Sequence, residues 1–388
     1  MRIVIFSCTF PSCSIENDPR VRKSGIWLQM LGHDVVYVEG WHSDVAPDVM
    51  LRDSGQDIDG IRLYHANGRT TGHIVGGIMS LKPDAIHAHE VGSLWALCAR
   101  IDERSAHLLK KEDKLRWEAE ISTERPEVDL LVYDAHEWER GRAVAPWEPH
   151  LIREHRFFES SCIHFADKVW VPSHAIQRAM IDTYALDTDV VTNSLPSDAV
   201  VRHPGILRST YPELRNRKVA IYSGVVSNER RTDAFLEACA RLNFAPVFMG
   251  GNYLMATESR KAIELGALFV PSQPYPYWGY NGVSMLDWIA GADVAFNGTS
   301  SAFSSFRMAL PNKVFEYSAA GVPCVSSPQI DVETAYEKTP DLGKIWRYDV
   351  EELMECFEDL IGIKAPADAL PRYETDLEAW GVYGRAMG

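Results

Sequence analysis

The amino-acid sequence predicts an α/β fold built from two doubly wound domains with parallel sheets. Three observations predict this fold. The chain has 388 residues, which suits two domains of about 100–200 residues each. Short continuous apolar stretches such as "RIVIF" and "LLVYD" alternate with helical patterns, as in parallel sheets covered by helices on both faces. A stretch rich in Pro, Ser and Arg, "SLPSDAVVRHPGILRSTYPELRNRK", separates two such series.

The first series of elements fills the N-terminal half of the chain. "RIVIF" predicts a strand, "RVRKSGIWLQML" a helix that ends at Gly32, and "DVVYV" the next strand. "DAIHAH", "DLLVYDAH" and "KVWVPS" predict further strands, and Ser173 is expected to cap the following helix. These elements predict a first domain at residues 1–198. The charged segment 102–129 is expected to form a solvated helix with a loop.

The second series begins after the Pro-rich stretch. Its predicted strands are "VAIYSG", "APVFMGG", "ALFVPS" and "ADVAFNG", and its first helix is "TDAFLEACARL". The predicted second domain covers residues 199–368, and residues 369–388 are expected to be helical. Ligands bind beyond the carboxyl ends of parallel strands and in clefts between domains, so we expect a ligand cleft between the two domains.

Composition disfavours several classes of protein. The net charge is −15, whereas a nucleic-acid-binding protein usually has a basic surplus. The seven cysteines are scattered without a C-x-x-C pair, which indicates a reducing, cytoplasmic location without a disulfide framework. The N-terminal "MRIVIFSCTF" is expected to be a strand and not a signal peptide. No apolar run reaches the ~18 residues that would span a bilayer.

Several catalytic signatures do not occur in the sequence. It contains no G-x-G-x-x-G, no G-x-x-x-x-G-K-[ST], no H-E-x-x-H and no G-x-S-x-G. These patterns are typical of dinucleotide-binding enzymes, P-loop proteins, zinc proteases and α/β-hydrolases. The predicted sheets therefore bind their ligand by other means.

The stretch "ALPNKVFEYSAAGVPCV", residues 309–325, predicts an anion site. Pro311 suits the first position of a helix, whose free N–H groups and dipole attract an anion. Lys313 opposes that dipole unless an anion binds. Glu316 lies three residues later on the same face, where it could accept hydrogen bonds from a vicinal diol such as a ribose. This combination suits a nucleoside diphosphate, while the alternative is a solvated ion pair on an ordinary helix.

The same stretch resembles the donor-site helix of GT-B glycosyltransferases, specifically the retaining enzymes of glycosyltransferase family 4. Other segments resemble landmarks of that family in the same order along the chain. They are "NDPRVRKSGIWLQMLGHDVVYV", "KPDAIHAHE", "LVYDAHE", "ADKVWVPSHAI" and "IYSGVVSNERRTDAFLEA". The resemblance covers nearly the whole chain and implies two Rossmann-like domains facing an interdomain cleft. It also implies that residues 369–388 cross back to the N-terminal domain.

The resemblance implies roles for residues of the second domain. Glu316 matches the carboxylate that holds the donor ribose, and Gly224 matches the glycine beside the diphosphate. Arg230 matches the cation that neutralises the leaving diphosphate, although "NERR" would also suit a solvated basic pair. The donor-binding residues that it implies are Gly224, Arg230, Arg231, Leu310, Asn312, Lys313 and Glu316.

The resemblance also implies acceptor-side residues in the first domain. His136, at the end of a predicted strand, matches a histidine near the transferring carbon, and His89 is the second candidate. A lone histidine in such a place is more often structural. Arg20 is a third acceptor-side candidate, with a salt bridge as the alternative. The implied catalytic residues are His136, Arg230 and Lys313.

Two positions depart from the family pattern. The family often has a second Glu eight residues before the ribose-binding Glu, and this chain has Met308 there. A thioether is a weak hydrogen-bond acceptor, so the donor sugar must be held by other groups or carry a modification. Many members have Arg after the matched glycine, where this chain has Val225. These departures affect the expected identity of the donor more than the expected type of reaction.

The activity implied is that of a retaining glycosyltransferase, resembling hexosyltransferases, with a nucleotide-diphosphate sugar as co-substrate. We expect no metal and no cofactor, because cations and a helix N-terminus would stabilise the leaving diphosphate. The acceptor is expected to be a saccharide, a lipid-linked intermediate or a small molecule, with peripheral membrane contact as an option in this family. Two alternatives are a non-catalytic nucleotide-sugar binding protein and a UDP-sugar 2-epimerase.

Overall fold

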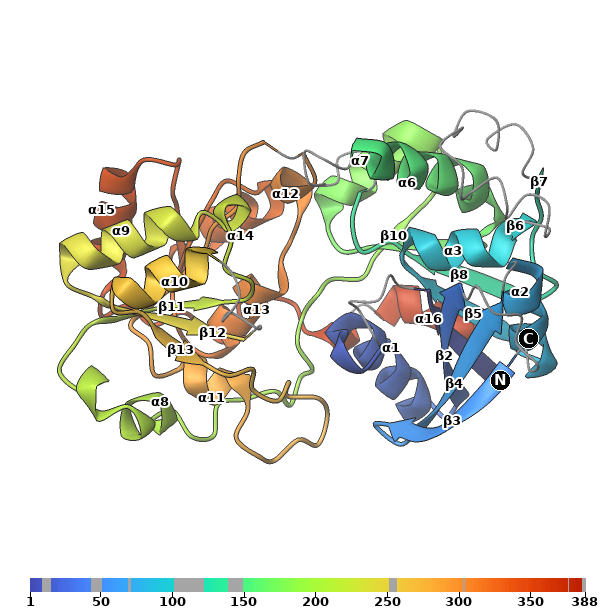
Figure 1. The fold of residues 1–388 in the computed structure, drawn as a ribbon, viewed down its shortest axis with the longest axis horizontal. Helices are drawn as coiled ribbons and strands as arrows, with labels where there is room; N and C mark the ends of the chain where they lie inside the picture. The colour runs from blue at the N-terminus through green and yellow to red at the C-terminus, as the bar shows by residue number, and fades with distance from the viewer. Residues whose placement is uncertain are drawn as a thin grey trace. The chain divides into compact units, whose positions relative to one another are not determined.

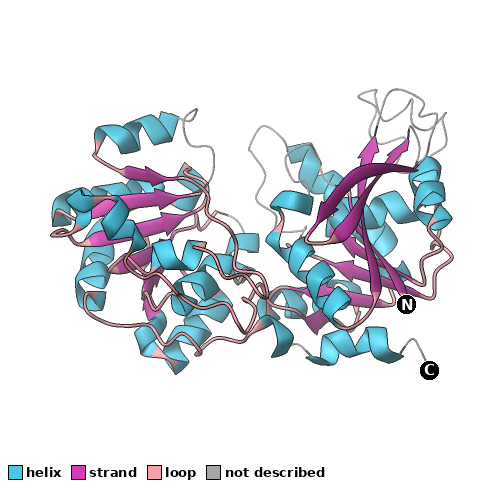
Figure 2. Cartoon of the chain, turned by 90° about the horizontal axis from the view of Figure 1, so that it is seen from below, coloured by secondary structure: helices cyan, strands magenta, loops and turns pink. Residues whose placement is uncertain are grey.

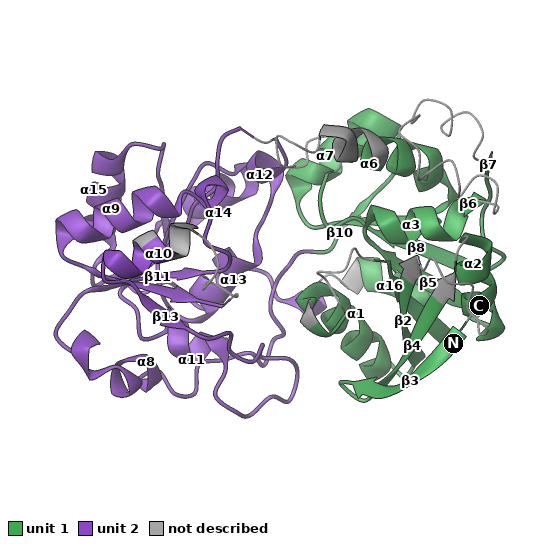
Figure 3. Cartoon of the chain, viewed as in Figure 1, with its two compact units in different colours: residues 1–191, 377–388 green, residues 192–376 purple. Residues whose placement is uncertain are grey.

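A computed structural model of the chain describes most of its residues. They are 1–8, 15–42, 51–68, 71–100, 122–138, 149–250, 257–302, 304–375 and 377–385. Contacts divide the chain into two units: unit 1 comprises residues 1–191 and 377–388, and unit 2 comprises residues 192–376 (Figure 3). Each unit is built on a mainly parallel sheet with helices packed on it (Figure 2). Most of the segment predicted as a charged helix lies outside the described residues.

Unit 1 contains an eight-stranded sheet in the order β10-β9-β8-β5-β1-β2-β4-β3. Figure 1 labels most of the strands of this sheet. All neighbouring strands are parallel except the antiparallel pair β3 and β4. A further antiparallel pair joins β6 and β7. The strands are β1 Arg2–Ser7, β2 Asp34–His42, β3 Leu51–Ile58, β4 Ile61–Gly68, β5 Ala85–His89, β6 Ala99–Arg100, β7 Ser122–Thr123, β8 Leu130–Asp134, β9 Lys168–Val171 and β10 Asp189–Val190. The helices are α1 Pro19–Met30, α2 Thr71–Ser80, α3 Glu90–Cys98, α6 Pro149–Cys162, α7 His174–Tyr184 and α16 Leu377–Arg385.

The helix boundaries in unit 1 follow from capping residues. The Asp18 carboxylate accepts hydrogen bonds from the first N–H groups of α1, and Pro19 occupies the first helical position. Ser173 caps α7 as the sequence predicts. Gly32 follows the last turn of α1 with a φ of +88°, a conformation that suits glycine. Helix α16, which follows unit 2 in the chain, packs in unit 1.

Unit 2 contains a six-stranded, all-parallel sheet in the order β13-β12-β11-β14-β15-β16. The strands are β11 Val219–Ser223, β12 Ala245–Met249, β13 Leu268–Val270, β14 Val294–Asn297, β15 Cys324–Ser326 and β16 Gly343–Ile345. The helices are α8 Ile206–Thr210, α9 Thr232–Leu242, α10 Thr257–Glu264, α11 Met285–Ile289, α12 Ser304–Met308, α13 Asn312–Ala319, α14 Ile330–Lys338 and α15 Val350–Leu360. This is the doubly wound strand order of a Rossmann-like domain.

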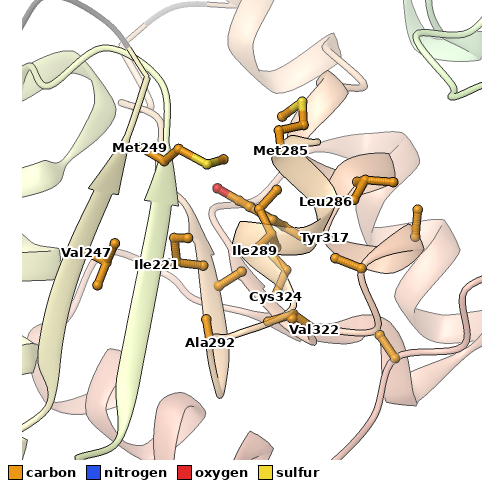
Figure 4. Packing of buried hydrophobic residues seen from close by; sticks show 14 of the residues in the cluster. Ile221, Val247, Met249, Met285, Leu286, Ile289, Ala292, Tyr317, Val322 and Cys324 are labelled. Atoms are coloured by element: carbon orange, nitrogen blue, oxygen red, sulfur yellow. The ribbon is translucent and has the colours of Figure 1, made fainter. Parts of the chain in front are cut away.

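Hydrophobic clusters cover both faces of the sheet of unit 2. One cluster joins Ile221 of β11, Val247 of β12 and Leu286 of α11 with Tyr317 of α13 (Figure 4). Because strand residues alternate between faces, the neighbouring Tyr222 belongs to the cluster on the other side. The prediction of two doubly wound α/β domains is therefore confirmed.

Two features differ from or extend the sequence-based description. The antiparallel strand β3 was not expected, because its residues are mostly exposed and carry no apolar pattern. The sequence placed domain boundaries at 198/199 and 368/369, whereas contacts divide the units at 191/192 and 376/377. Among the described helices, none is long and apolar enough to cross a membrane.

Candidate functional site

The turn after β11 lies where unit 2 is doubly wound. β11 pairs with β12 on one side and β14 on the other, which is where ligands bind in open α/β sheets. Gly224 follows β11 with a φ of +128°, a region that other residues adopt only with strain. A Cβ at this position would lie 3.0 Å from both Cε and Nζ of Lys313. The glycine therefore allows the lysine to approach the turn.

Lys313 brings an unfavourably placed positive charge to this turn. Its Nζ lies 5.4 Å from the ring centroid of Tyr222. Burial, and then repulsion by Arg230, lower the pKa of Lys313 to about 8, although Glu316 opposes the shift. An anion bound near this ammonium group would favour its charged form.

Arg230 is held beside Lys313 by a contact between two loops. Its guanidinium carbon lies 4.5 Å from the centroid of the Phe306 ring. The backbone N–H of Ser300 donates to the carbonyl oxygen of Glu229 at 2.7 Å. A Cβ at Gly298 would come within 2.4 Å of the Arg230 carbonyl oxygen, so glycine is required there. The loops after β11 and β14 therefore position Arg230 together.

Arg231 differs from its neighbour. Its Nε lies 3.5 Å from the Asp233 carboxylate, and its guanidinium lies over the rings of Trp346 and Tyr348 at 5.3 and 5.7 Å. Arg231 is the N-cap of helix α9, and its φ of +51° is in the left-handed region. Its charge is thus already paired, and its aromatic contacts hold it against the end of the sheet.

Arg230 and Lys313 also lie near aromatic rings, but they differ from Arg231 in their carboxylate contacts. Among the side chains that the structure describes, no carboxylate oxygen lies within 4.0 Å of either cation. Two neighbouring positive charges without a carboxylate partner are unfavourable unless an anion joins them. A bound anion would relieve this repulsion at the turn.

Helix α13 presents the remaining predicted donor-site residues. The sequence predicts that Pro311 is the first residue of this helix. In the structure Pro311 is instead the N-cap, and it supplies no side-chain cap. Asn312 is the first helical residue and is partly buried. Leu310 packs against the core of unit 2. Glu316 is only 6% exposed, one turn inside the helix.

Tyr317 fixes α13 to the sheet, a role that sequence patterns did not indicate. Its hydroxyl accepts a hydrogen bond from the N–H of Ser223 at 2.9 Å and donates to the carbonyl oxygen of Phe296 at 3.2 Å. These groups belong to β11 and β14, so the helix is tied to both strands that flank the turn. The available signal was the tyrosine that follows Glu316 in the sequence, since the hydroxyl of a buried tyrosine usually finds a hydrogen-bond partner.

A cavity of about 450 Å³ opens at the ends of β14, β15 and β16. Its lining includes Ser300, Ser301, Ser304, Arg307, Met308 and Tyr348. Met308, the first position that departs from the family pattern, therefore contributes a thioether to a wall that is otherwise rich in hydroxyl groups. Val225, the second, is 67% exposed.

In unit 1, Arg20 and Asp134 form a buried ion pair. Arg20 Nε lies 2.9 and 3.0 Å from the two carboxylate oxygens, and Nη2 lies 2.5 Å from Oδ1. Nη1 donates to the carbonyl oxygen of Val191 at 2.8 Å. Arg20 is only 4% exposed and Asp134 is fully buried. Arg20 therefore forms a salt bridge, which was the alternative to an acceptor-side role.

Both candidate histidines lie beside this ion pair. His89, the last residue of β5, is fully buried, and its Nδ1 lies 3.3 Å from Asp134 Oδ2 and 2.9 Å from His136 Nε2. His136 Nδ1 lies 3.2 Å from Glu90 Oε1 and 3.8 Å from Asp18 Oδ2. The structure brings Arg20 of α1 together with His89 and His136, which lie at or just after the ends of the neighbouring strands β5 and β8.

Electrostatics separate the protonation states within the cluster. Burial lowers the pKa of His89 well below its usual value. Burial also lowers the pKa of His136, but the carboxylates of Asp18 and Glu90 outweigh it and raise that pKa overall. Burial would raise the pKa of Asp134, yet Arg20 lowers it well below the usual range. His89 is thus neutral, Asp134 ionised and His136 the readily protonated member.

A third histidine extends the cluster toward the C-terminal helix. The hydroxyl of Tyr383 in α16 lies 2.8 Å from His87 Nδ1. Candidate metal-ligand atoms of His87, His89 and Asp134 lie within 4.8 Å of one another. The guanidinium of Arg20 already binds both oxygens of Asp134 and would repel a second cation. We therefore interpret this group as a salt-bridged network.

Comparisons with known proteins agree with the fold. No protein-family model matches the sequence, and no curated protein matches it. Among solved structures, sucrose-phosphate synthase from Thermosynechococcus elongatus is similar, with 13% identity and a TM-score of 0.68 over 100% of this chain and 98% of that one. Anabaena HepE in complex with UDP and glucose has 13% identity and a TM-score of 0.65, covering 100% and 99%. WaaG, a glycosyltransferase involved in lipopolysaccharide biosynthesis, has 13% identity and a TM-score of 0.59, covering 98% and 99%.

The chain has the GT-B fold. Its two parallel-sheet units match those of these glycosyltransferases over almost their entire lengths. Identity at this level is informative about the fold, while the activity must be argued from the residues of the site.

Proposed function

We propose that the protein is a retaining glycosyltransferase, related to family 4, that moves a sugar from a nucleoside-diphosphate sugar to a hydroxyl acceptor. The observation that carries this proposal is the pair of uncompensated cations, Arg230 and Lys313, at the Gly224 turn. Solved structures of similar fold include complexes with UDP, and with UDP and glucose. A diphosphate supplies the negative charge that this turn of unit 2 requires.

Each donor-site residue has a role in this proposal. The diphosphate lies along the Gly224 turn, where Arg230 and Lys313 contact its oxygens. The N-terminal turn of α13, beginning at Asn312, adds N–H groups and the positive end of the helix dipole. Glu316 accepts hydrogen bonds from the ribose hydroxyls, while Leu310 and Arg231 shape the surrounding loops.

Catalysis follows from the charge that develops during the reaction. As the C1–O bond breaks, the leaving diphosphate becomes more negative, and Arg230 and Lys313 stabilise that charge. These two cations take the part that a metal ion plays in other phosphate sites, so we propose a metal-independent reaction. The acceptor, of the saccharide, lipid-linked or small-molecule class, lies on the side of His136 in unit 1.

Nucleotide binding tests this proposal first. Thermal unfolding is measured with UDP, GDP, ADP, CMP, dTDP and NAD⁺, and we expect one diphosphate to stabilise the protein. At a hundredfold excess over Kd the stabilisation is about 2.7 kcal/mol. Lys313→Met should weaken it, whereas Lys338→Met, on the exposed face of α14, should not. No response to any diphosphate, or a response to NAD⁺ alone, would contradict the proposal.

Catalysis is tested separately from binding. The selected donor sugar is incubated with the protein, and products are identified by mass spectrometry and NMR. Transfer to a hydroxyl acceptor with an unchanged anomeric configuration is the expected result. A bound donor that is neither transferred nor hydrolysed would indicate a binding protein, and isomerisation at C2 would indicate an epimerase.

A further inference from the structure

Gln329 is a buried polar residue whose side chain does not cap the helix that it precedes. It is the N-cap of α14, a position where Ser, Thr, Asp and Asn are preferred because their short side chains bond the first N–H groups. The side chain of Gln329 makes no such bond and is fully buried. A buried amide is satisfied by other partners, and those partners indicate what Gln329 does.

The amide of Gln329 joins two strand ends to helix α12. Asn297, the last residue of β14, donates from Nδ2 to Gln329 Oε1 at 2.8 Å and to Oγ of Ser326, the last residue of β15, at 2.9 Å. Gln329 Nε2 donates to the carbonyl oxygen of Phe306 in α12 at 3.1 Å. The strand order reverses between β11 and β14, so this network lies at the switch point of the unit 2 sheet.

Helix α12 depends on such contacts because it is short. It has five residues, Ser304–Met308, and the last four carbonyl groups of a helix have no partner within it. The carbonyl group of Phe306 is one of these four, and Gln329 supplies a donor to it. The bond therefore holds the piece of backbone from which the Phe306 ring projects.

The Phe306 ring is the surface against which Arg230 lies. The guanidinium carbon of Arg230 is 4.5 Å from the ring centroid, and the face of an aromatic ring attracts a cation. Phe306 is buried and Arg230 is half-buried. A displacement of the α12 backbone would therefore move the ring and change where the guanidinium lies.

The same strand ends also support the backbone near Arg230. The N–H of Thr299 donates to Ser327 Oγ at 2.9 Å, and the N–H of Ser327 donates to the carbonyl oxygen of Asn297 at 3.0 Å. The N–H of Ser300, which follows Thr299, donates to the carbonyl oxygen of the residue before Arg230. Both the backbone and the side chain of Arg230 are thus positioned from the end of β14.

We propose that Gln329 is a positioning residue of the donor site, which holds Arg230 in place for the diphosphate through the carbonyl group and the ring of Phe306. This inference rests on the proposed function, in which Arg230 contacts the diphosphate. Gln329 acts without touching the ligand. A cation that is held before binding loses less conformational freedom when the ligand arrives, so its contact with the diphosphate is stronger. All the residues of this chain of contacts belong to unit 2.

The first test observes Arg230 in the full-length protein without a ligand. Gln329→Met replaces the amide by an apolar side chain of similar length. The matched control is Asp287→Asn, which weakens another buried side chain of unit 2 that accepts hydrogen bonds from the N–H groups of Arg202 and His203. NMR follows the Nε–Hε signal of Arg230, which is assigned by its loss in Arg230→Met. We expect Gln329→Met to shift this signal and Asp287→Asn to leave it in place.

The second test measures the Kd of the diphosphate that the binding experiment selects. Gln329→Met should raise this Kd about fivefold to thirtyfold, since the two residues are coupled through Phe306. Asp287→Asn should lose stability and keep the wild-type Kd. In the Arg230→Met background, Gln329→Met should change the Kd by less than about twofold, because the cation that it positions is gone.

Gln329→Glu adds a readout that a merely structural role would not change. The carboxyl group can still accept from Asn297, but it can donate to the Phe306 carbonyl only when it is protonated. Burial raises the pKa of such a carboxyl group, so the ratio of the variant Kd to the wild-type Kd should be near one at about pH 5.5 and rise toward about pH 7.5. This variant decides the question if Gln329→Met does not fold.

The outcomes separate this inference from the proposed function. Absence of nucleotide binding by the wild type overturns the proposed function and, with it, the positioning role. If the wild type binds, an unchanged Kd in Gln329→Met overturns only the assignment of Gln329, and so does a Gln329→Glu ratio that is constant with pH. An equal loss of affinity with and without Arg230 would show that the effect does not pass through that cation. The same loss in Asp287→Asn would show a general effect of stability, and either result overturns the assignment.

Discussion

The two units differ in whether the positive charges near the switch point of the sheet are paired with carboxylates. In unit 1, the cation Arg20 is paired with Asp134, and His136 lies against Glu90. In unit 2, Arg230 and Lys313 have no carboxylate within 4.0 Å among the described side chains. Both groups lie at the switch point of a doubly wound sheet.

The difference indicates which ligand each unit receives. A network whose charges are already paired keeps its geometry without a ligand and suits a neutral acceptor bound by hydrogen bonds. A pair of uncompensated cations is completed only by an anion, which suits a nucleoside diphosphate. In this interpretation, unit 1 positions the neutral acceptor, and unit 2 binds the negatively charged nucleoside diphosphate.

The largest effect is expected when the internal pairing of unit 1 is broken. Asp134→Asn leaves the guanidinium of Arg20 buried without its carboxylate, which should lower the free energy of unfolding of this unit by about 3–5 kcal/mol. Hydrogen exchange of the β8 amides measures this loss within unit 1. Asp129→Asn, an exposed change just before β8, should have little effect.

A double substitution sharpens this test. Arg20→Met with Asp134→Leu removes both charges, so much of the lost stability should return, because no buried charge is left unpaired. If Asp134→Asn costs less than about 1 kcal/mol, the ion pair is not the anchor of the unit 1 network.

The next largest effect concerns the turn that admits Lys313 in unit 2. Gly224→Ala introduces strain at a φ of +128° and places a Cβ 3.0 Å from Lys313 Nζ. We expect a loss of stability of roughly 1–3 kcal/mol and weaker nucleotide binding. Gly266→Ala is the matched control, since its φ is +79° and no other group lies within 4 Å of the place that its Cβ would take. The control should lose stability and keep its nucleotide Kd. Equal Kd values for both variants would contradict the role of the turn.

A smaller effect is expected from the titration of Lys313. The pKa of Lys313 is about 8 in the free protein, because of burial and then Arg230, and a bound anion should raise it. Below pH 8 the lysine is charged in both states, and binding has its full strength. Above pH 8 the free lysine loses its proton while the bound one keeps it, so affinity should fall by up to about tenfold per pH unit.

Calorimetry checks this linkage directly. Nucleotide binding at about pH 8.5, in buffers with different ionisation enthalpies, should show net proton uptake. Lys313→Met should bind more weakly and show neither the proton uptake nor the loss of affinity above pH 8. A Kd that is constant across that range in the wild type would show that Lys313 does not contact the anion.

Sequence patterns predicted the elements that are buried continuously and the glycines that a turn requires. The strands around Ile221 and Val247 were predictable because parallel strands covered on both faces are apolar throughout. Gly224 and Lys313 could be chosen because the donor helix carries a local motif. The strand β3 could not be found because its residues are mostly exposed and carry no apolar pattern, and it joins the sheet by pairing with β4.

Contacts between distant segments were not predictable from one sequence. Arg20 and Asp134 are 114 residues apart, and Tyr383 contacts His87 across 296 residues. The strained φ of Glu90 likewise arises from the way that β5 joins α3, and glutamate has no preference for that conformation. The sequence therefore left two alternatives for Arg20, which the structure places in the first turn of α1 beside its partner Asp134.

The smallest expected effect comes from adding charge to unit 2. Val225 is 67% exposed beside the Gly224 turn, and its carbonyl oxygen accepts a hydrogen bond from Tyr222 that a new side chain would not disturb. Val225→Arg should add a third cation to the anion site and tighten nucleotide binding by about 0.2–1 kcal/mol at low salt. The gain should shrink as salt screens the exposed charge. Val200→Arg, at a 45% exposed position elsewhere in unit 2, should give no gain. The same gain in both variants would mean that net charge, and not the turn, determines the affinity.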